Sequence, residues 1–342
     1  MQDSSTLPMA QWARRYSIEH NPLGTGSFAT VYRAVDRTTG EAVAVKAMRK
    51  RKLGAKALEM LSAEITILRS LQHPNVVCLR DSHSDDAHMF IVLEYCAGGD
   101  LAAYIHSWGA APEAVARHFM RQLAAGLGFL RSKRLIHRDI KPQNLLLTED
   151  SPRAGLKIAD FGLARHLARA SMAETMVGSP LYMAPEILSN QSYDAKADLW
   201  STGAVLYELL TTKHPFSGAN QVELLQNIRN KRLRLPPGLR LSPPCTRLLA
   251  MLLVPSPSKR ASLDDLLGAV FLRSPEDEEG IGADPPQLEP PAVGLGPTGP
   301  DPGAGPESVP AAAAAAAVAA RGPAVASGGY ACPGRGLEKA HG

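Results

Sequence analysis

The chain has 342 residues, 45% hydrophobic and 20% charged, with a formal net charge of +4 at pH 7. These values are ordinary for a globular protein. No uncharged apolar run is long enough to cross a bilayer, and the N-terminus lacks the apolar core of a secretory signal, which argues against a membrane span and against export. The four cysteines are scattered without metal-ligand spacing (Cys78, Cys96, Cys245, Cys332). We therefore expect free thiols and a cytoplasmic location.

The charge is unevenly distributed along the chain. Residues 273–342 hold nine acidic and four basic side chains, so residues 1–272 carry about +9. Such a basic region can attract nucleic acid, an acidic membrane or a phosphate-bearing ligand, and the charge alone does not distinguish them. Its densest basic run, at 49–52, is typical of a solvated loop, and we expect no nucleic-acid partner.

The first hundred residues combine β-like runs with one helical pattern. Residues 1–15 form an N-terminal extension. The β-like runs, separated by turn residues, lie at 16–18, 30–35, 42–45 and 89–93. The helical pattern has one apolar face formed by Leu58, Leu61, Ile65 and Leu68.

Helical periodicity dominates after residue 100. One stripe consists of Val115, Phe119, Leu123, Leu127 and Leu130. A nearly all-apolar helix is predicted at 199–210, opened by Asp198. We therefore predict an α+β fold with two lobes, a small β-rich N-lobe with one key helix at about 16–96 and a larger, mainly helical C-lobe at about 97–272. A cleft between two such lobes is a natural ligand site.

Residues 273–342 differ in composition from the rest. They contain twelve prolines and thirteen glycines, and residues 311–317 are all alanine. A segment of this kind buries too little apolar surface to offset the entropy of ordering. We predict a disordered Pro/Gly/Ala-rich tail.

A turn with two glycines, Gly24-Thr25-Gly26, lies between two predicted strands. Glycine lets a backbone approach phosphate oxygens closely, although an ordinary turn accounts for the pattern at least as well. The Walker A sequence is absent. A dinucleotide-binding fingerprint is excluded because Ala29 occupies the place of its third glycine and a strand follows.

One apolar strand ends in Lys46, and the predicted helix carries Glu64 on its buried face. By itself Lys46 is typical of an edge-strand lysine that faces water. An unpaired buried carboxylate at Glu64 would cost roughly 3–5 kcal/mol. We therefore expect Lys46 to pair with Glu64 and to hold nucleotide phosphates.

Two further segments, HRDIKPQN and DFG, place polar residues between apolar runs. Asp139 can accept a hydroxyl proton, and Lys141 can neutralise a transferring phosphoryl group. Asn144 and Asp160 supply oxygen ligands of the kind that Mg²⁺ prefers. A purely structural network of satisfied polar groups is the alternative interpretation.

Together these motifs resemble those of the eukaryotic protein kinase family and follow the order found there. The matching segments are GTGSFATV at 24–31, VAVK at 43–46, Glu64, HRDIKPQN at 137–144, DFG at 160–162 and APE at 184–186. Each motif is weak alone, but the ordered set is specific. The resemblance spans about residues 16–272 and implies an ion pair between Glu186 and Arg260.

The resemblance implies a kinase that uses ATP and Mg²⁺. Asp139 and Lys141 would be catalytic, and Asn144 and Asp160 would bind the metal. Lysine two residues after Asp139 is the serine/threonine form. The implied ATP site consists of Leu23, Gly24, Thr25, Gly26, Ser27, Phe28, Ala29, Thr30, Val31, Ala44, Lys46, Glu64, Glu94, Cys96 and Leu146, with adenine bonded to the backbone of Glu94 and Cys96.

A closer resemblance is to the autophagy-initiating ULK-type kinases. It rests on Ala29, EYCAGGDL at 94–101, HRDIKPQN, and the segments GSPLYMAPEIL and YDAKADLWSTGAVLYELLT. It implies protein substrates with serine or threonine acceptors, and autophagy initiation factors as candidate partners. Members of this group usually dock regulatory partners through a C-terminal helical domain, which residues 273–342 do not resemble.

The resemblance also suggests how the enzyme is regulated and which substrates it selects. Thr175 lies where phosphorylation activates family members, and Arg138 is placed to hold that phosphate; an ordinary exposed threonine is the alternative. Gln143 replaces a glutamate found in arginine-preferring kinases, so we expect weak selection for basic residues before the phosphoacceptor. A calcium/calmodulin-dependent or AMP-activated type of kinase is the alternative enzyme class. A catalytically silent scaffold is disfavoured because the catalytic positions are intact.

Overall fold

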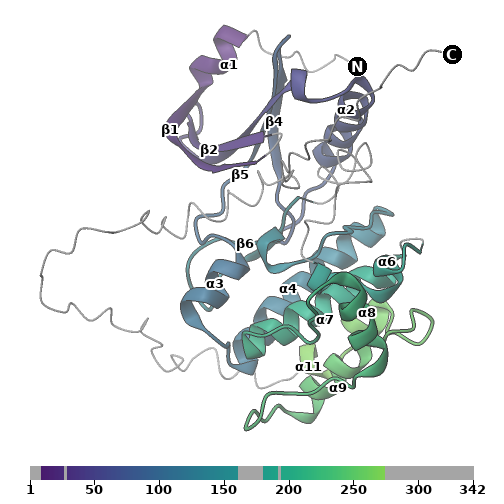
Figure 1. Ribbon diagram of the computed structural model, residues 1–342. Helices are drawn as coiled ribbons and strands as arrows, with labels where there is room; N and C mark the ends of the chain where they lie inside the picture. Colours follow the sequence, from purple (N-terminus) through teal and green to yellow (C-terminus); the bar gives the residue numbers. More distant parts are fainter. Residues whose placement is uncertain (1–8, 27–28, 161–179, 192–193, 274–342) are drawn as a thin grey trace, which may run out of the picture.

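The computed structural model describes residues 9–26, 29–160, 180–191 and 194–273. They form two lobes, drawn one above the other in Figure 1. The smaller lobe contains a five-stranded antiparallel sheet and the long helix α2, and the larger lobe is mainly helical. The predicted two-lobe α+β architecture is confirmed.

The sheet of the smaller lobe has the strand order β1-β2-β3-β5-β4, and each pair of neighbours is antiparallel. The strands are β1 Tyr16–Thr25, β2 Ala29–Asp36, β3 Ala42–Arg49, β4 Leu79–Ser84 and β5 His88–Glu94. Four of them contain the predicted β-like runs. Strand β4 was not predicted, because its sequence, LRDSHS, lacks the β-branched and aromatic residues that mark strands.

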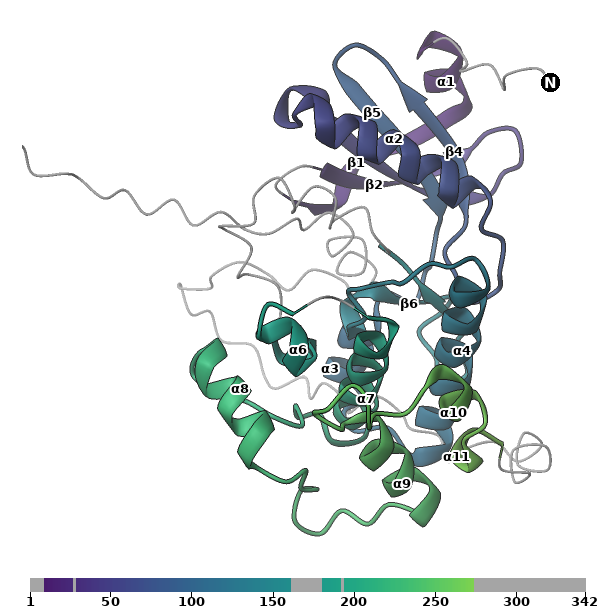
Figure 2. The same cartoon turned by 90° about the vertical axis from the view of Figure 1, so that its right-hand side faces the viewer.

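Helix α2 (Ala55–Arg69) covers one face of this sheet (Figure 2). Its buried side chains Leu61, Ile65 and Leu68 belong to the same apolar cluster as Met48 and Ile91 of the sheet. The helical face predicted from the spacing of these residues is therefore confirmed.

Helix α1 (Met9–Arg15) lies within the extension to which the sequence assigned no structure. Its Trp12 is 2% exposed and packs with Val43, Val45 and Val92. Successive residues of a strand point to opposite faces, so Trp12 covers the face opposite to α2. Burial of this indole, together with the ion pair between Arg15 and Asp36 at 2.7 Å, fixes the extension to the sheet.

The larger lobe follows β5 in chain order. Its helices are α3 Leu101–Trp108, α4 Glu113–Ser132, α6 Pro185–Leu188, α7 Ala195–Thr211, α8 Gln221–Asn230, α9 Pro243–Leu252, α10 Leu263–Leu267 and α11 Val270–Arg273. A two-stranded sheet, β6 Leu145–Leu147 and β7 Leu156–Ile158, lies beside them. Short 3₁₀ turns occupy Pro142–Asn144 and Pro180–Tyr182.

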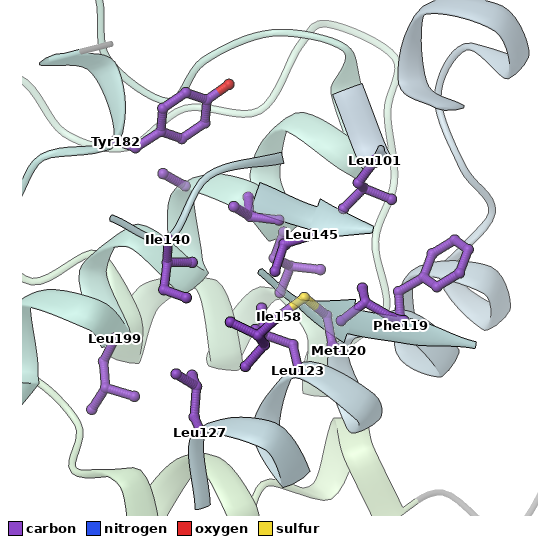
Figure 3. Close-up of a cluster of buried hydrophobic side chains, with 14 of the residues drawn as sticks. Leu101, Phe119, Met120, Leu123, Leu127, Ile140, Leu145, Ile158, Tyr182 and Leu199 are labelled. Carbon is purple, nitrogen blue, oxygen red and sulfur yellow. The ribbon is translucent and has the colours of Figure 1, made fainter. Parts of the chain in front are cut away.

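Helix α4 carries the core of this lobe. Its predicted stripe is buried from Phe119 to Leu130, and Figure 3 shows the stripe meeting Ile140, Leu145 and Ile158. Gly126 allows the closest approach, since a Cβ there would lie 2.7 Å from Cδ1 of Ile158. The stripe therefore packs directly against the β6–β7 sheet, which precedes the DFG segment in the chain.

Helix α7 begins earlier than predicted. It starts at Ala195, with Asp194 at the N-cap position, so Asp198 lies inside the first turn. Asp198 is only 5% exposed, and its carboxylate is used by another segment, as described below. The prediction that Asp198 opens the helix was therefore wrong.

The basic run and the tail can be placed only in part. Residues Lys50–Lys52 form a 3₁₀ turn without buried residues, in agreement with a solvated segment. Of the predicted tail, only Arg273 falls within the described residues, as the last residue of α11. Among the described helices, none combines the length and the apolarity that crossing a bilayer requires.

Candidate active site

The loop of residues 137–144 is anchored from helix α7. The two carboxylate oxygens of Asp198 accept the backbone N–H groups of His137 and Arg138, each at 2.9 Å. The His137 ring is 1% exposed, and its Nε2 lies 2.9 Å from the carbonyl oxygen of Ala159. Arg138 has φ +74°, a left-handed conformation that costs energy for a non-glycine residue. The loop is thus fixed both to α7 and to the segment that leads into Asp160.

Asp139, Lys141 and Asn144 form one hydrogen-bonded cluster. Lys141 Nζ donates to Asp139 Oδ2 at 2.7 Å, and Asn144 Nδ2 donates to the same oxygen at 2.8 Å. Asn144 also donates to the backbone oxygen of Asp139 at 2.7 Å. Asn144 is 2% exposed, whereas the Asp139 side chain is 41% exposed. The buried Asn144 and the Lys141 ammonium therefore orient the Asp139 carboxylate, which remains accessible to solvent.

Lys46 and Asp160 form an ion pair between the lobes. Nζ of Lys46 lies 3.0 Å from Oδ1 of Asp160, and both side chains are 9% exposed. Asp160 has φ +55°, again in the left-handed region. A buried ion pair in a strained backbone is a poor source of stability, and strain of this kind gathers at functional sites.

The predicted partner of Lys46 was Glu64. Glu64 belongs to helix α2, but its side chain lies outside the described part of the chain, so the pair stays a prediction. Asp160, 114 residues away in sequence, is the partner that the structure gives to Lys46. The sequence argument assigned both residues to one site but did not foresee their direct contact.

Two small apolar clusters contain the side chains predicted to contact adenine, one within the N-lobe sheet and one that joins residues of both lobes. The first comprises Leu23, Val31 and Ala44 of strands β1, β2 and β3. The second is made by Leu93, Leu146, Val77, Cys96 and Ala159. The predicted adenine-contacting side chains therefore fall into two separate clusters, and their contact with adenine stays a prediction.

The glycine turn closes the hairpin between β1 and β2. Gly24 pairs with Val31 and Thr25 pairs with Thr30. The N–H of Gly26 donates to the carbonyl of Ala29 at 2.8 Å. Ser27 and Phe28, at the tip, lie outside the described residues.

The segment joining the lobes begins at Glu94. Its backbone N–H donates to the carbonyl of Cys78 at 2.9 Å, and its carboxylate pairs with Lys157 Nζ at 2.8 Å. Burial, with a smaller contribution from the charge of Glu94, raises the pKa of the Cys96 thiol to about 12. Cys96 is therefore a neutral thiol that contributes an apolar surface.

Asn144 and Asp160 are brought together by backbone pairing. The N–H of Ala159 donates to the backbone oxygen of Asn144 at 2.9 Å, so Asp160 follows directly on a residue bonded to Asn144. In the described ranges, no cluster of three or more His, Cys, Asp or Glu side chains could hold a metal. An amide and a carboxylate fit Mg²⁺, because this ion keeps waters and takes further oxygens from phosphates.

The remaining residues predicted from the resemblance have different outcomes. Arg260 and Glu186 form the expected ion pair, a bidentate contact at 2.7 and 2.9 Å, and both residues are buried. Thr175 lies outside the described residues. Gln143, next to Asn144, has its side-chain Oε1 buried without a hydrogen-bond partner among the described residues.

Sequence reasoning missed the anchoring role of two residues. His137 was noted only as part of a motif, and Asp198 only as the start of a helix. The signal for Asp198 was present, since an acidic residue in a nearly all-apolar helix needs a buried partner. The partner, a pair of backbone N–H groups, could not be read from side-chain patterns.

Comparison with known proteins matches residues 17–272 to the protein kinase domain. The serine/threonine-protein kinase ATG1a of Arabidopsis thaliana is 50% identical over 256 residues, which are 74% of this chain and 41% of that protein. The serine/threonine-protein kinase ULK3 of Xenopus laevis is 44% identical over 253 residues, 73% of this chain and 54% of that protein. The chain thus spans about half or less of the length of these relatives.

The fold has a counterpart among solved structures. The crystal structure of Rad53 1-466 in complex with AMP-PNP superimposes with a TM-score of 0.65 at 33% identity, covering 75% of this chain and 65% of that one. The family match extends over most of the chain, and the same residues form the two lobes and the charged junction between them. The chain therefore belongs to the protein kinase family, and within it is similar to the ATG1 and ULK serine/threonine kinases.

Proposed function

We propose that this chain is an ATP-dependent protein kinase that phosphorylates serine or threonine side chains of proteins. One observation carries the proposal: Asp139 is held by two hydrogen-bond donors, Lys141 and Asn144, yet its carboxylate is 41% exposed. This arrangement presents an oriented carboxylate to an incoming molecule.

Asp139 acts on the substrate hydroxyl in this proposal. Its carboxylate accepts the hydroxyl proton as the oxygen attacks the γ-phosphorus, while the bond from that phosphorus to the β-phosphate oxygen breaks and ADP leaves. General-base catalysis of this kind contributes about 10²- to 10⁴-fold to the rate. Asn144 keeps the carboxylate in one orientation. The Lys141 ammonium neutralises negative charge on the phosphoryl group while it is transferred. The Asp198 carboxylate, by accepting the backbone N–H groups of His137 and Arg138, fixes the position of this cluster in the C-lobe.

Lys46 and Asp160 serve the triphosphate. Lys46, at the junction of the lobes, binds the α- and β-phosphates, and Glu64 is its proposed second partner. Asn144 and Asp160 are the proposed ligands of Mg²⁺, which supplies charge neutralisation for the phosphates. A compact ammonium on a flexible stem can exchange a carboxylate for a phosphate without moving the backbone.

The two apolar clusters are the proposed walls of the adenine site. Leu23, Val31 and Ala44 would cover one face of the base and Leu146 the other. Leu93 lies in the second cluster, and we propose that it forms the rear of the site. Backbone groups of Glu94 and Cys96 would bind the edge of the base.

We further propose a role in autophagy initiation, with a kinase domain at 16–272 whose lobes divide near residue 96. The ATG1 and ULK names of the relatives support this role. Autophagy initiation factors are the proposed partners. A cytoplasmic location is proposed because Cys78, Cys96 and Cys245 are all free thiols, the state expected in a reducing compartment.

The catalytic proposal is tested by ATP turnover of Asp139→Asn. Asparagine still accepts the bonds of Lys141 and Asn144 but cannot take the proton, so we expect turnover to fall at least about 10²-fold while the fold is kept. Asp86→Asn is the matched control, an exposed aspartate in the turn between β4 and β5. Unchanged turnover in Asp139→Asn would make the chain a scaffold rather than an enzyme.

The choice of substrate is tested with a peptide array. Gln143 carries no charge, so we expect weak selection for basic residues before the phosphoacceptor. An array dominated by arginine at those positions would contradict this proposal. Phosphotyrosine among the products would contradict the serine/threonine assignment.

The cellular role is tested separately from the chemistry. Deletion of the chain in its own cell should block autophagosome formation, and wild type but not Asp139→Asn should restore it. Co-purification of autophagy initiation factors would support the same role. A kinase of the calcium/calmodulin-dependent or AMP-activated type is the second candidate, and normal autophagosome formation after deletion would favour it.

A further inference from the structure

A cavity of about 440 Å³ lies in the C-lobe between helices α4, α7 and α10. Its walls are mostly apolar and include Leu130, Leu135, Ile136 and Leu199. Figure 2 shows the three helices side by side in the lower lobe. None of the residues that we assign to ATP or metal lines it. A cavity of this size and lining is suited to an apolar ligand group.

The rim of this cavity is basic. Arg131, Arg134 and Lys196 lie among its lining residues. Arg131 is paired with Asp264 at 2.7 Å. Lys196 donates to the backbone oxygen of Arg260, and Arg134 is exposed. The Asp265 carboxyl, whose pKa is lowered mainly by its hydrogen bonds from Ser262 and in smaller part by Lys196, lies within the electrostatic reach of Lys196. Within the described residues neither Lys196 nor Arg134 forms a salt bridge, so the rim can offer both positive charges to an acidic partner.

The sequence contains an acidic segment without an assigned role. Residues 276–279 read Glu-Asp-Glu-Glu, the densest acidic run of the chain, and Ile281 follows two positions later. This run begins three residues after Arg273, where the described chain ends. The net charge of the chain therefore changes from positive to negative most abruptly at residues 276–279, shortly after the last described residue.

The chain leaves the fold close to the cavity. The Arg273 guanidinium lies 3.8 Å from the Cβ position of Gly268, which follows α10. Leu263, at the other end of this five-residue helix, lines the cavity, and a helix of five residues is about 7.5 Å long. The eight residues that follow Arg273, up to Ile281, can span up to roughly 26 Å. Their length is sufficient to reach the rim.

We propose that the acidic segment at 276–279 binds the rim formed by Arg134 and Lys196, and that Ile281 enters the apolar cavity. Tethering gives such a segment a local concentration in the millimolar range, so weak contacts suffice. The cavity wall includes His137 and Asp198, which anchor the loop that carries Asp139. A side chain bound in this cavity would therefore contact His137 and Asp198, the residues that hold the proposed catalytic loop in place.

The test uses the full chain with p-benzoylphenylalanine, a photo-crosslinker, in place of Ile281. Irradiation followed by peptide mapping should give crosslinks within one chain to 127–137, 195–199 or 262–263. Arg134→Glu should lower their yield about fivefold, because one attraction becomes a repulsion. At about 1 M salt, where the Debye length is roughly 3 Å, the yield should fall similarly. Neither readout depends on kinase activity.

Two further variants complete the design. Ala195→Phe should abolish the crosslinks by filling the cavity, since Ala195 is exposed and lines it. Arg232→Glu is the matched charge control, an exposed arginine after α8 (Gln221–Asn230), a helix that Figure 2 shows across α7 from α10. Thermal unfolding checks that each variant is folded.

Three outcomes would overturn the proposal. Crosslinks between two chains would assign the cavity to a second copy, and crosslinks to other parts of the fold would assign the segment elsewhere. Yields in folded Arg134→Glu and Ala195→Phe equal to those of Arg232→Glu would show that neither rim nor cavity holds the segment.

Discussion

Asp198→Asn changes the acceptor that holds the loop of residues 137–144. In the native protein the two carboxylate oxygens of Asp198 accept the N–H groups of His137 and Arg138, each at 2.9 Å. Asparagine keeps one acceptor and replaces the other with an NH₂ group that faces an N–H donor. At a site where Asp198 is only 5% exposed, water cannot easily satisfy the donor that is left over.

The expected effect follows from this geometry. A hydrogen bond to a charged group contributes about 1.5–3 kcal/mol, and a buried donor left unsatisfied costs about 1–3 kcal/mol. These two costs partly describe the same lost contact, so they do not add in full. We expect the free energy of unfolding to fall by about 2–4 kcal/mol. Asp139 follows the released N–H group directly, and misplacement of a reacting group by about 1 Å can cost 10²-fold in rate. Turnover should therefore fall by about that factor.

Urea unfolding and ATP turnover of the same preparations measure the two effects. Asp194→Asn is the control, since Asp194 is an exposed residue four positions earlier whose side chain makes no capping bond. Equal stability of the two variants would refute the anchoring role of Asp198. A loss of stability without a loss of turnover at a temperature where both are folded would refute its link to Asp139.

Three other predictions concern packing, ionisation and regulation. Gly126→Ala should cost about 1–3 kcal/mol by overpacking, because its Cβ would lie 2.7 Å from Cδ1 of Ile158; Gly128→Ala, whose nearest contact would be at 3.8 Å, should not, and equal denaturant midpoints would contradict this. Burial raises the pKa of the Glu208 carboxyl above its ordinary value near 4.5, so its contribution to stability is lost as pH rises through the raised pKa. Glu208→Gln should therefore gain stability relative to wild type as the pH rises above about 4.5, and a pH-independent difference in unfolding free energy would be inconsistent with this pKa shift. Thr175→Ala should lower the turnover of purified enzyme if phosphorylation there activates it, and unchanged turnover would end that hypothesis.

The fold was predictable wherever neighbouring residues carry a period. The stripe from Phe119 to Leu130 and the face of α2 were predicted because one helix side repeats every three or four residues. Strand β4 and helix α1 were missed. Both are short, largely polar segments that are stabilised by contacts with distant parts of the chain. Trp12 of α1, for example, packs on the sheet face opposite to α2.

The candidate site was predictable as a set of residues but not as a set of contacts. Asp139, Lys141 and Asn144 lie within six positions, and the structure joins them directly. For Lys46, the sequence indicated Glu64, whereas the described partner is Asp160 from the other lobe. Local burial arguments identify which charges need partners but do not identify the partners.

Motif order and hydrophobic periodicity by themselves determined the family, the two lobes and the residues of the candidate site, because these depend on spacings along the chain. Tertiary structure alone decided that Asp198 supports the loop of Asp139, that Lys46 meets Asp160, and that a basic-rimmed cavity opens between α4, α7 and α10. Each of these contacts joins segments that are 60 or more residues apart. Such distances in sequence are bridged only when the chain packs, within the C-lobe for Asp198 and the cavity, and between the lobes for Lys46.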